Sequence, residues 1–198
     1  MWTETGRMIK KSIAIGVLIS LFSCQSENYI PKPIGYSRLD YPAHNYVLQP
    51  TNDCPFVFEL GSTSNYVEVP AAIGQRCWFN IEYPIQNAKI HVSYLDIQPQ
   101  QLETFISDAR KLALEHLAKA DDFEENVIYD PQAKVFGVVY DFQGGTASNM
   151  QFYLTDSTSH FIRGALYFHS IPNPDSLAPA EQYVEEELMH LINSFQWK

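Results

Sequence analysis

Alternating apolar and polar residues predict β-strands in the first half of the chain. In residues 78–83 every second side chain is apolar, and residues 89–95 repeat the pattern. A period of two places one set of side chains on the buried face of a sheet. Two shorter apolar segments, residues 56–58 and 66–69, are further candidate strands.

A different period follows and predicts a helix over residues 99–120. Apolar residues recur there at steps of three and four, and Pro99 occupies a first-turn position where proline is tolerated. His116 falls on this apolar stripe, so we interpret it as a packed residue rather than a metal ligand. An acidic segment, which we interpret as solvated rather than as a cation site, comes next: Asp121, Asp122, Glu124 and Glu125.

The last third of the chain predicts a strand meander and a second helix. The candidate strands are residues 126–129, 134–142, 148–155 and 161–169. Their short, turn-rich connections indicate antiparallel pairing. After a group of prolines, an apolar stripe from Leu177 to Phe195 predicts the terminal helix.

This order of elements predicts an α+β fold. Two widely separated helices and six or more strands favour a single, mainly antiparallel sheet flanked by two helices. The order of a strand block, a helix, a meander and a terminal helix resembles the Mog1/PsbP-type α-β-α sandwich.

The N-terminus predicts export and lipid attachment. Basic residues precede an apolar run, Ile13 to Phe22, which is shorter than the roughly 20 residues that span a bilayer. The sequence Leu-Phe-Ser-Cys at residues 21–24 resembles the bacterial lipobox. We therefore predict a lipoprotein signal peptide over residues 1–23 and a covalent lipid on Cys24, the one cofactor expected. An ordinary signal peptide with a cysteine nearby is the alternative.

The charge of the chain argues against nucleic acid as a partner. Thirteen Lys and Arg residues stand against 23 Asp and Glu residues, a formal net charge of −10, and no basic cluster occurs. Binding to phosphates requires such a cluster, and adsorption to anionic lipid is disfavoured for the same reason. Membrane attachment is thus expected through the lipid alone.

The two cysteines after Cys24 predict a disulfide. In an exported protein, Cys54 and Cys77 most simply pair with each other. Both thiols being reduced is the main alternative. A redox pair or a metal site is disfavoured, because there is no Cys-x-x-Cys motif and no histidine at ligand spacing. We predict no metal site.

The mature chain divides into a tether and a domain. Residues 24–53 are predicted as a lipidated tether and an aromatic, proline-rich arm, and residues 54–198 as a single α+β domain. The arm is too apolar for a plain solvated linker, so part of it is expected to pack on the domain, or else on a partner. For partner contact, we consider the arm from Tyr29 to Leu48 and the region from Gly144 to Asn149.

Catalytic signatures are largely absent from the sequence. It contains no phosphate-binding glycine loop, no Gly-x-Ser-x-Gly and no His-Glu-x-x-His. Asp156, Ser157 and His160 have the residue types of acyl-transfer chemistry, but such roles depend on spatial geometry. We favour a polar turn there and no catalytic residues. The alternatives are an envelope hydrolase using these residues and a small-ligand-binding lipoprotein using the concave face of the sheet.

The histidines are scattered along the sequence: His44, His91, His116, His160, His169 and His190.

Several segments resemble the gliding-motility lipoprotein family GldD of Bacteroidota. The similar segments occur in the family's order along nearly the whole mature chain: residues 29–36, 54–56, 77–81, 90–94, 108–113, 152–158, 161–168 and 173–179. The resemblance implies an envelope lipoprotein needed for gliding and associated with type IX protein secretion. It implies no catalytic residues, and Cys24 is the one functional position that it transfers.

These observations predict a non-enzymatic accessory or stabilising scaffold of the cell envelope. The expected acyl modification, with palmitate as a typical chain, would anchor it, in the outer membrane and facing the periplasm. The expected partners are other gliding or type IX secretion lipoproteins and outer-membrane components.

Overall fold

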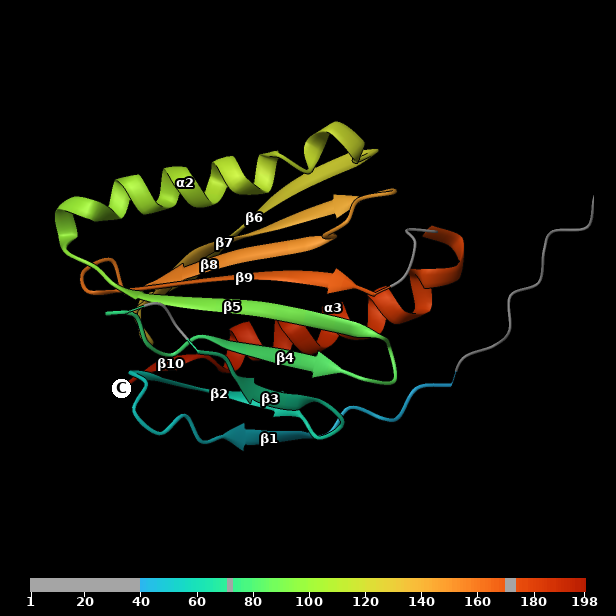
Figure 1. Cartoon of the computed structure of the whole chain (residues 1–198), viewed down its shortest axis with the longest axis horizontal. Helices are drawn as coiled ribbons and strands as arrows, with labels where there is room; N and C mark the ends of the chain where they lie inside the picture. The colour runs from blue at the N-terminus through green and yellow to red at the C-terminus, as the bar shows by residue number, and fades with distance from the viewer. Residues whose placement is uncertain (1–39, 71–72, 170–173) are drawn as a thin grey trace, which may run out of the picture. The chain divides into compact units, whose positions relative to one another are not determined.

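The computed structural model describes residues 40–70, 73–169 and 174–198 (Figure 1). For residues 174–176 it describes the backbone only. The predicted signal peptide, Cys24 and the first part of the arm lie outside these described residues.

A seven-stranded antiparallel sheet forms the centre of the described chain. Its strand order is β3-β4-β5-β9-β8-β7-β6. The neighbours β5 and β9 come from distant parts of the sequence and pair over nine residues, which joins the two halves of the chain. The strands are β3 (Asn65–Glu68), β4 (Phe79–Tyr83), β5 (Ala88–Asp96), β6 (Asp122–Asp130), β7 (Val135–Gln143), β8 (Met150–Thr155) and β9 (His160–Phe168).

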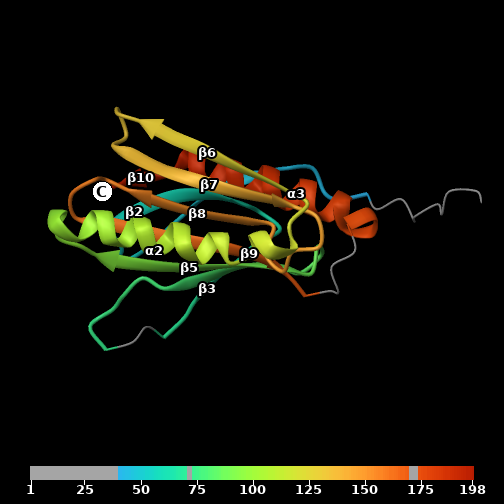
Figure 2. The ribbon, with the colours of Figure 1, turned by 90° about the horizontal axis from the view of Figure 1, so that it is seen from above.

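One helix lies along the middle of one sheet face. A 3-10 turn (Pro99–Gln101) leads into α2 (Leu102–Leu114), and a second 3-10 turn (Leu117–Lys119) follows. Ala109 and Ala113 are buried on its inner side, and such small side chains let the helix approach the aromatic rings beneath it. Figure 2 shows α2 along β8 and β9, with β6 to one side and β3 to the other.

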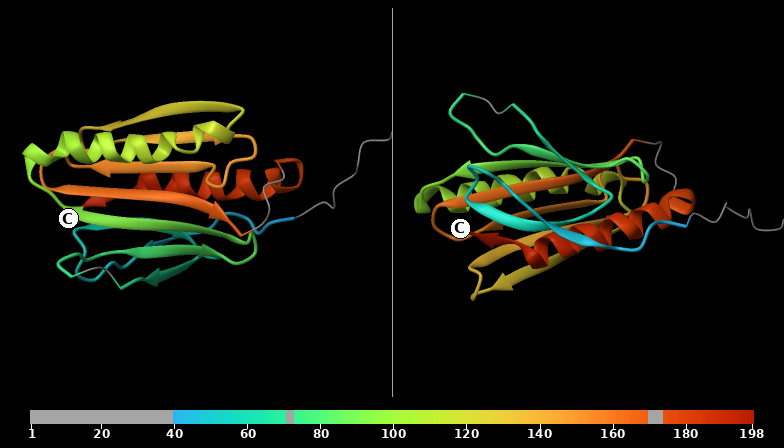
Figure 3. Two further views of the ribbon diagram at one scale, coloured as in Figure 1. Left: turned by 45° about the horizontal axis from the view of Figure 1, so that its top comes forward. Right: turned by 90° about the horizontal axis from the view of Figure 1, so that it is seen from below.

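The opposite sheet face is covered by α3 (Pro174–Ser194) and a small antiparallel sheet. That sheet has the order β1-β2-β10, with β1 (Tyr46–Gln49), β2 (Phe56–Gly61) and β10 (Gln196–Trp197). Figure 3 shows α2 and α3 on opposite faces. The main core therefore lies on the α3 side, where α3, β2 and the central strands contribute Phe56, Phe58, Phe79, Ile90, Leu154, Val184, Leu188 and Phe195.

The α+β class, the antiparallel pairing and the two flanking helices are confirmed, but the structure has two sheets where the sequence predicted one. The segment from residue 56 pairs with the arm and with the C-terminus rather than with the large sheet. Both of its partners, β1 and β10, are too short to show a period. The predicted helix to residue 120 ends at Leu114, and the acidic segment after it is part of β6. Four of the nine residues of β6 are acids and most of the strand is exposed, which is a composition typical of a loop.

The structure contains the predicted disulfide between Cys54 and Cys77, with Cα atoms 5.7 Å apart. It joins the residue two positions before β2 to the residue two positions before β4, so it links the two sheets.

Within the described part of the chain, neither helix combines the length and the apolar character that crossing a bilayer requires.

Removing the disulfide should weaken the fold. The Cys54→Ser, Cys77→Ser double variant should lose about 3 kcal/mol of unfolding free energy, because the unfolded chain regains the freedom of the closed loop. Urea denaturation measures this loss, and reducing the unaltered protein should reproduce it. An unchanged midpoint in both experiments would contradict a stabilising role.

Gly164 should be intolerant of any side chain. A Cβ at this position in β9 would lie 2.2 Å from the ring of Phe152, which is itself buried. Gly164→Ala should therefore cost about 1–3 kcal/mol through overpacking. The matched control is Gly145→Ala, where no atom lies within 4 Å. Equal denaturation midpoints for the two variants would show that β8 and β9 accommodate the extra methyl group without loss of stability.

Candidate functional site

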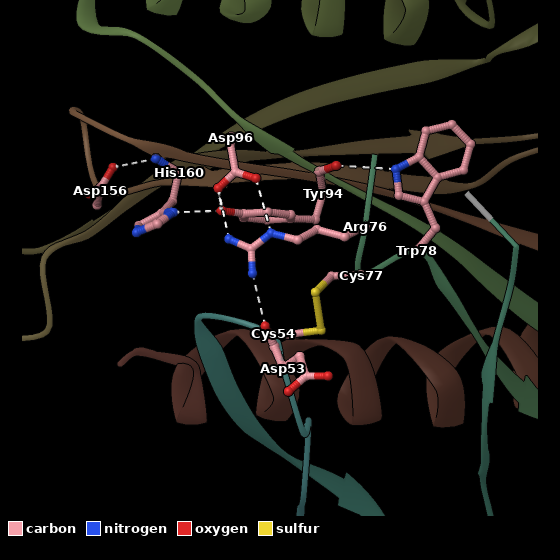
Figure 4. A network of polar contacts seen from close by, with 9 residues as sticks. All are labelled: Asp53, Cys54, Arg76, Cys77, Trp78, Tyr94, Asp96, Asp156 and His160. Atoms are coloured by element: carbon pink, nitrogen blue, oxygen red, sulfur yellow. Dashed lines mark hydrogen bonds and ion pairs between the residues drawn. A yellow bond between two sulfur atoms is a disulfide. The ribbon is translucent and has the colours of Figure 1, made fainter. Parts of the chain in front are cut away.

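Arg76 joins the disulfide region to β5 (Figure 4). Its Nε and Nη2 donate to the two carboxylate oxygens of Asp96 at 3.0 and 2.9 Å, and its Nη1 donates to the carbonyl of Asp53 at 2.9 Å. The guanidinium holds the pKa of Asp96 below its ordinary value. Both side chains are about half exposed, so this pair stabilises the fold only weakly. Its main effect is to fix the segment that carries Cys77.

His160 belongs to the same polar network. The Tyr94 hydroxyl donates to Asp96 at 2.6 Å and lies 2.7 Å from His160 Nδ1. Burial raises the pKa of Tyr94, so the phenol stays protonated and able to donate. The His160 ring also stacks on Trp197, with centroids 5.2 Å apart. The network thus ties β5, β9 and β10 together.

Residues 156–160 form a capped turn between β8 and β9. Asp156 Oδ1 accepts the backbone N–H groups of Thr158, Ser159 and His160 at 2.8–2.9 Å, and Oδ2 accepts the Thr158 hydroxyl. Burial raises the pKa of Asp156, but these hydrogen bonds outweigh it and lower the pKa to about 2.

The geometry of this turn gives the hydrolase alternative no support. Ser157 lies at the tip with φ 67°, and its N–H donates to Thr155. Among the described contacts, no hydrogen bond joins the Ser157 hydroxyl to His160 or Asp156. A nucleophile and its base are expected within hydrogen-bond reach of each other. The carboxylate of Asp156 is already occupied by the turn.

The other sequence candidates are also spread over the fold. His91, on β5, lies 2.8 Å from Asn80 Oδ1, and His116 packs near Phe142. Burial lowers the pKa of both histidines. In the acidic segment, Glu125 pairs with Arg110 at 2.8 Å. No group of three or more metal-ligating side chains occurs among the residues that the structure describes.

The described part of the arm is held against α3, a feature whose residues the sequence did not indicate. His44 lies between two carboxylates, with Nε2 2.9 Å from Glu186 and Nδ1 2.5 Å from Glu187. Its ring stacks on Tyr183, with centroids 4.4 Å apart. Glu187 is only 2% exposed, and His44 supplies a hydrogen-bond partner for its Oε1.

Tyr46 continues this contact one step along the arm. Its ring stacks on His190 of α3, and His190 Nε2 lies 2.8 Å from Glu59 of β2. We call these contacts of His44 and Tyr46 with α3 the arm clasp. The only sequence signal for it was the excess of aromatic residues in the arm.

The region from Gly144 to Asn149, considered for partner contact, is exposed only at Gly145 and Ala147. Thr146, Ser148 and Asn149 are buried, and Asn149 Nδ2 donates to Glu181 of α3 at 2.6 Å. This hydrogen bond connects the segment after β7 to α3. By contrast, Val47 and Leu48 of the arm are 51% and 64% exposed.

An apolar surface occurs instead at the β6 edge of the large sheet. Val127 and Tyr129 are 75% and 74% exposed, and they face Val138 and Phe136 across the strand pair. The Tyr129 and Phe136 rings are 5.5 Å apart. We call these four residues the edge patch. Beyond it, the outer side of β6 pairs with no other strand within the described chain. The sequence predicted this strand in part, but not its position at the edge.

Comparison with known proteins identifies the family. The model of the family "Gliding motility lipoprotein GldD" matches residues 26–197. No curated protein matches the chain. Among solved structures, the solution structure of cyanobacterial PsbP (CyanoP) from Synechocystis sp. PCC 6803 is similar to 84% of this chain and 100% of its own. Its TM-score is 0.43 and its sequence identity 11%.

The family match extends from the arm to the last strand. It therefore covers the arm clasp, the disulfide and the edge patch together. A lipoprotein of this kind is associated with the cell envelope and is involved in gliding motility. The chain belongs to the gliding motility lipoprotein GldD family.

Proposed function

We propose that this protein is a non-enzymatic scaffold of the cell envelope that supports gliding motility and type IX protein secretion. It would hold and stabilise other lipoproteins and outer-membrane components of that machinery. Membership of the GldD family supports the gliding role. The capped turn at residues 156–160 supports a non-enzymatic role, because the carboxylate of Asp156 is engaged in the hydrogen bonds of the turn.

The proposed anchor is a lipid, with palmitate as a typical acyl chain, on Cys24 after removal of residues 1–23. Each buried CH₂ contributes about 0.8 kcal/mol, so more than one chain gives stable attachment. Residues 24–198 carry 10 basic and 22 acidic side chains, a net charge of −12. This charge would repel anionic headgroups and keep the domain off the membrane surface. We place the anchor in the outer membrane, with the domain facing the periplasm.

The arm clasp suits a protein that is held by its N-terminus. β1 pairs with β2, and His44 and Tyr46 contact α3. Tension on the arm would therefore act on the β1–β2 pairing and on the arm clasp before it reached the core. This arrangement favours an anchored support over a freely diffusing enzyme.

The edge patch is the observation that carries the proposal of partner binding. A long edge strand with exposed apolar side chains is a template for pairing with another chain. β6 has nine residues, none of them proline or lysine, and two of them are large exposed apolar residues. We propose that an envelope protein of the gliding or secretion machinery adds an extended segment to this edge.

The charge of β6 indicates which kind of segment would bind. The strand carries Asp122, Glu124, Glu125 and Asp130. These acids would repel a second copy of the same strand and attract a basic segment. The expected partner segment is therefore extended, basic and from a different protein.

The anchor can be tested in cells. Deleting the gene should abolish surface spreading and export of secreted cargo, and the unaltered gene should restore both. A Cys24→Ala gene should fail to restore them, since the domain would lose its membrane attachment. Immunoblotting confirms that the variant is present. Normal spreading in the deletion strain would contradict the proposed function.

The edge patch can be tested by affinity purification from gently solubilised envelopes. With Val127→Lys and Tyr129→Lys combined, recovery of gliding or secretion proteins should fall at least about tenfold, because charge replaces the apolar contact. The matched control is Leu112→Lys on α2, which replaces another exposed apolar residue. Equal recovery with both variants, or a loss with both, would place the partner elsewhere.

A further inference from the structure

A hollow lies on the α2 face of the large sheet, beside the helix. It has a volume of about 510 Å³ and extends over β4, β5 and β9, and we call it the groove. The sheet towards β3 lies to one side of α2 in Figure 2, away from β6. The groove, which reaches β9, is thus separated by β8 from the edge patch on β7 and β6. Its main lining residues are Trp78, Asn80, His91, Ser93, Arg163 and Tyr167.

Arg163 is a cation without a counterion in this groove. Its Nη2 donates to Gln151 Oε1 at 2.6 Å, and no carboxylate of the described residues forms an ion pair with it. Burial lowers its pKa, while Tyr167 and Glu115 act from a distance in the opposite direction. A partly buried charge is costly without a partner. An anion in the groove would provide one.

Gln151 adds an unused hydrogen-bond donor beside the guanidinium. The residue is 1% exposed, and its Nε2 has no partner among the described residues. Buried polar groups normally have a partner. Because its Oε1 accepts from Arg163, the amide and the guanidinium lie next to each other. Gln151 does not itself line the groove, so Arg163 presents the N–H groups there, and none of the lining residues is an acid.

The remaining lining residues indicate what the anion would be attached to. Trp78 and Tyr167 supply aromatic surfaces. His91 lies 2.8 Å from Asn80 Oδ1 through Nδ1, which leaves Nε2 for a ligand. The volume is that of a pocket for a small molecule, within the range of roughly 300–1,000 Å³. Planar guanidinium groups bind carboxylates through two parallel hydrogen bonds.

We propose that the groove binds a small organic acid, with its carboxylate on Arg163 and an apolar or aromatic body along Trp78 and Tyr167. This binding site is additional to the scaffold function and does not depend on it. It would also make the domain responsive to a soluble compound of the periplasm.

Ligand-observed ¹⁹F NMR tests the proposal on the full-length protein in detergent micelles. The probe is 5-fluoroindole-3-acetate, the matched neutral probe is 5-fluoroindole-3-acetamide, and empty micelles are the blank. The unaltered protein should bind the carboxylate at least about tenfold more tightly than the amide. Arg163→Met should abolish that preference, whereas Arg110→Met, which removes an exposed arginine paired with Glu125, should leave it intact.

Thermal stability and a second variant separate loss of binding from loss of folding. The melting temperature of Arg163→Met should be unchanged or higher, because the variant loses a partly buried charge that has no ion pair among the described residues. If that variant does not fold, Ser93→Phe should block both probes by filling the groove. The proposal is overturned if the unaltered protein binds neither probe above the blank or does not distinguish them. It is also overturned if Arg163→Met or Ser93→Phe retains the preference for the carboxylate.

Discussion

Burial of aromatic side chains between α3, β2 and the large sheet is the constraint on which the rest of this fold depends. Phe56, Phe58 and Phe79 have at most 1% exposure. Phe56 and Phe58 stack with Phe195, which directly follows α3, and Phe79 stacks with Phe58. Full burial of one such side chain contributes about 1.5–3 kcal/mol. This cluster fixes β2, and β2 in turn positions β1, β10 and the disulfide. The arm is therefore attached to the most strongly packed part of the domain.

The positions of the groove and the edge patch follow from the placement of α2. Because α2 lies along β8 and β9, it leaves sheet face uncovered on both sides. One side holds the groove with Arg163, for which the described residues provide no ion pair, and the other holds the edge patch on β6 and β7. A wider helical layer would have buried both. The two surfaces differ in chemistry, since the first is suited to a small acid and the second to a protein strand.

Most of the core could be predicted from the sequence, whereas the functional surfaces could not. The alternation in residues 78–95 and the helical stripe before residue 114 identified β4, β5 and α2, because burial on one face imposes a period. The pairing of Cys54 with Cys77 was predicted from export and from the two cysteines that remain after Cys24. The arm clasp and the groove could not be predicted, since Glu187, Arg163 and their partners meet only through long-range strand pairing. The edge position of β6 depends in the same way on sheet order.

The most direct test of the scaffold account is photo-crosslinking in living cells, with a benzoylphenylalanine in place of Tyr129. The account predicts a crosslink to one envelope protein of the gliding or secretion machinery, identified by mass spectrometry. The same group in place of Ile85, another exposed apolar residue outside the edge patch, should not give this product. A protein that crosslinks equally from both positions, or from neither, would contradict partner binding at the β6 edge.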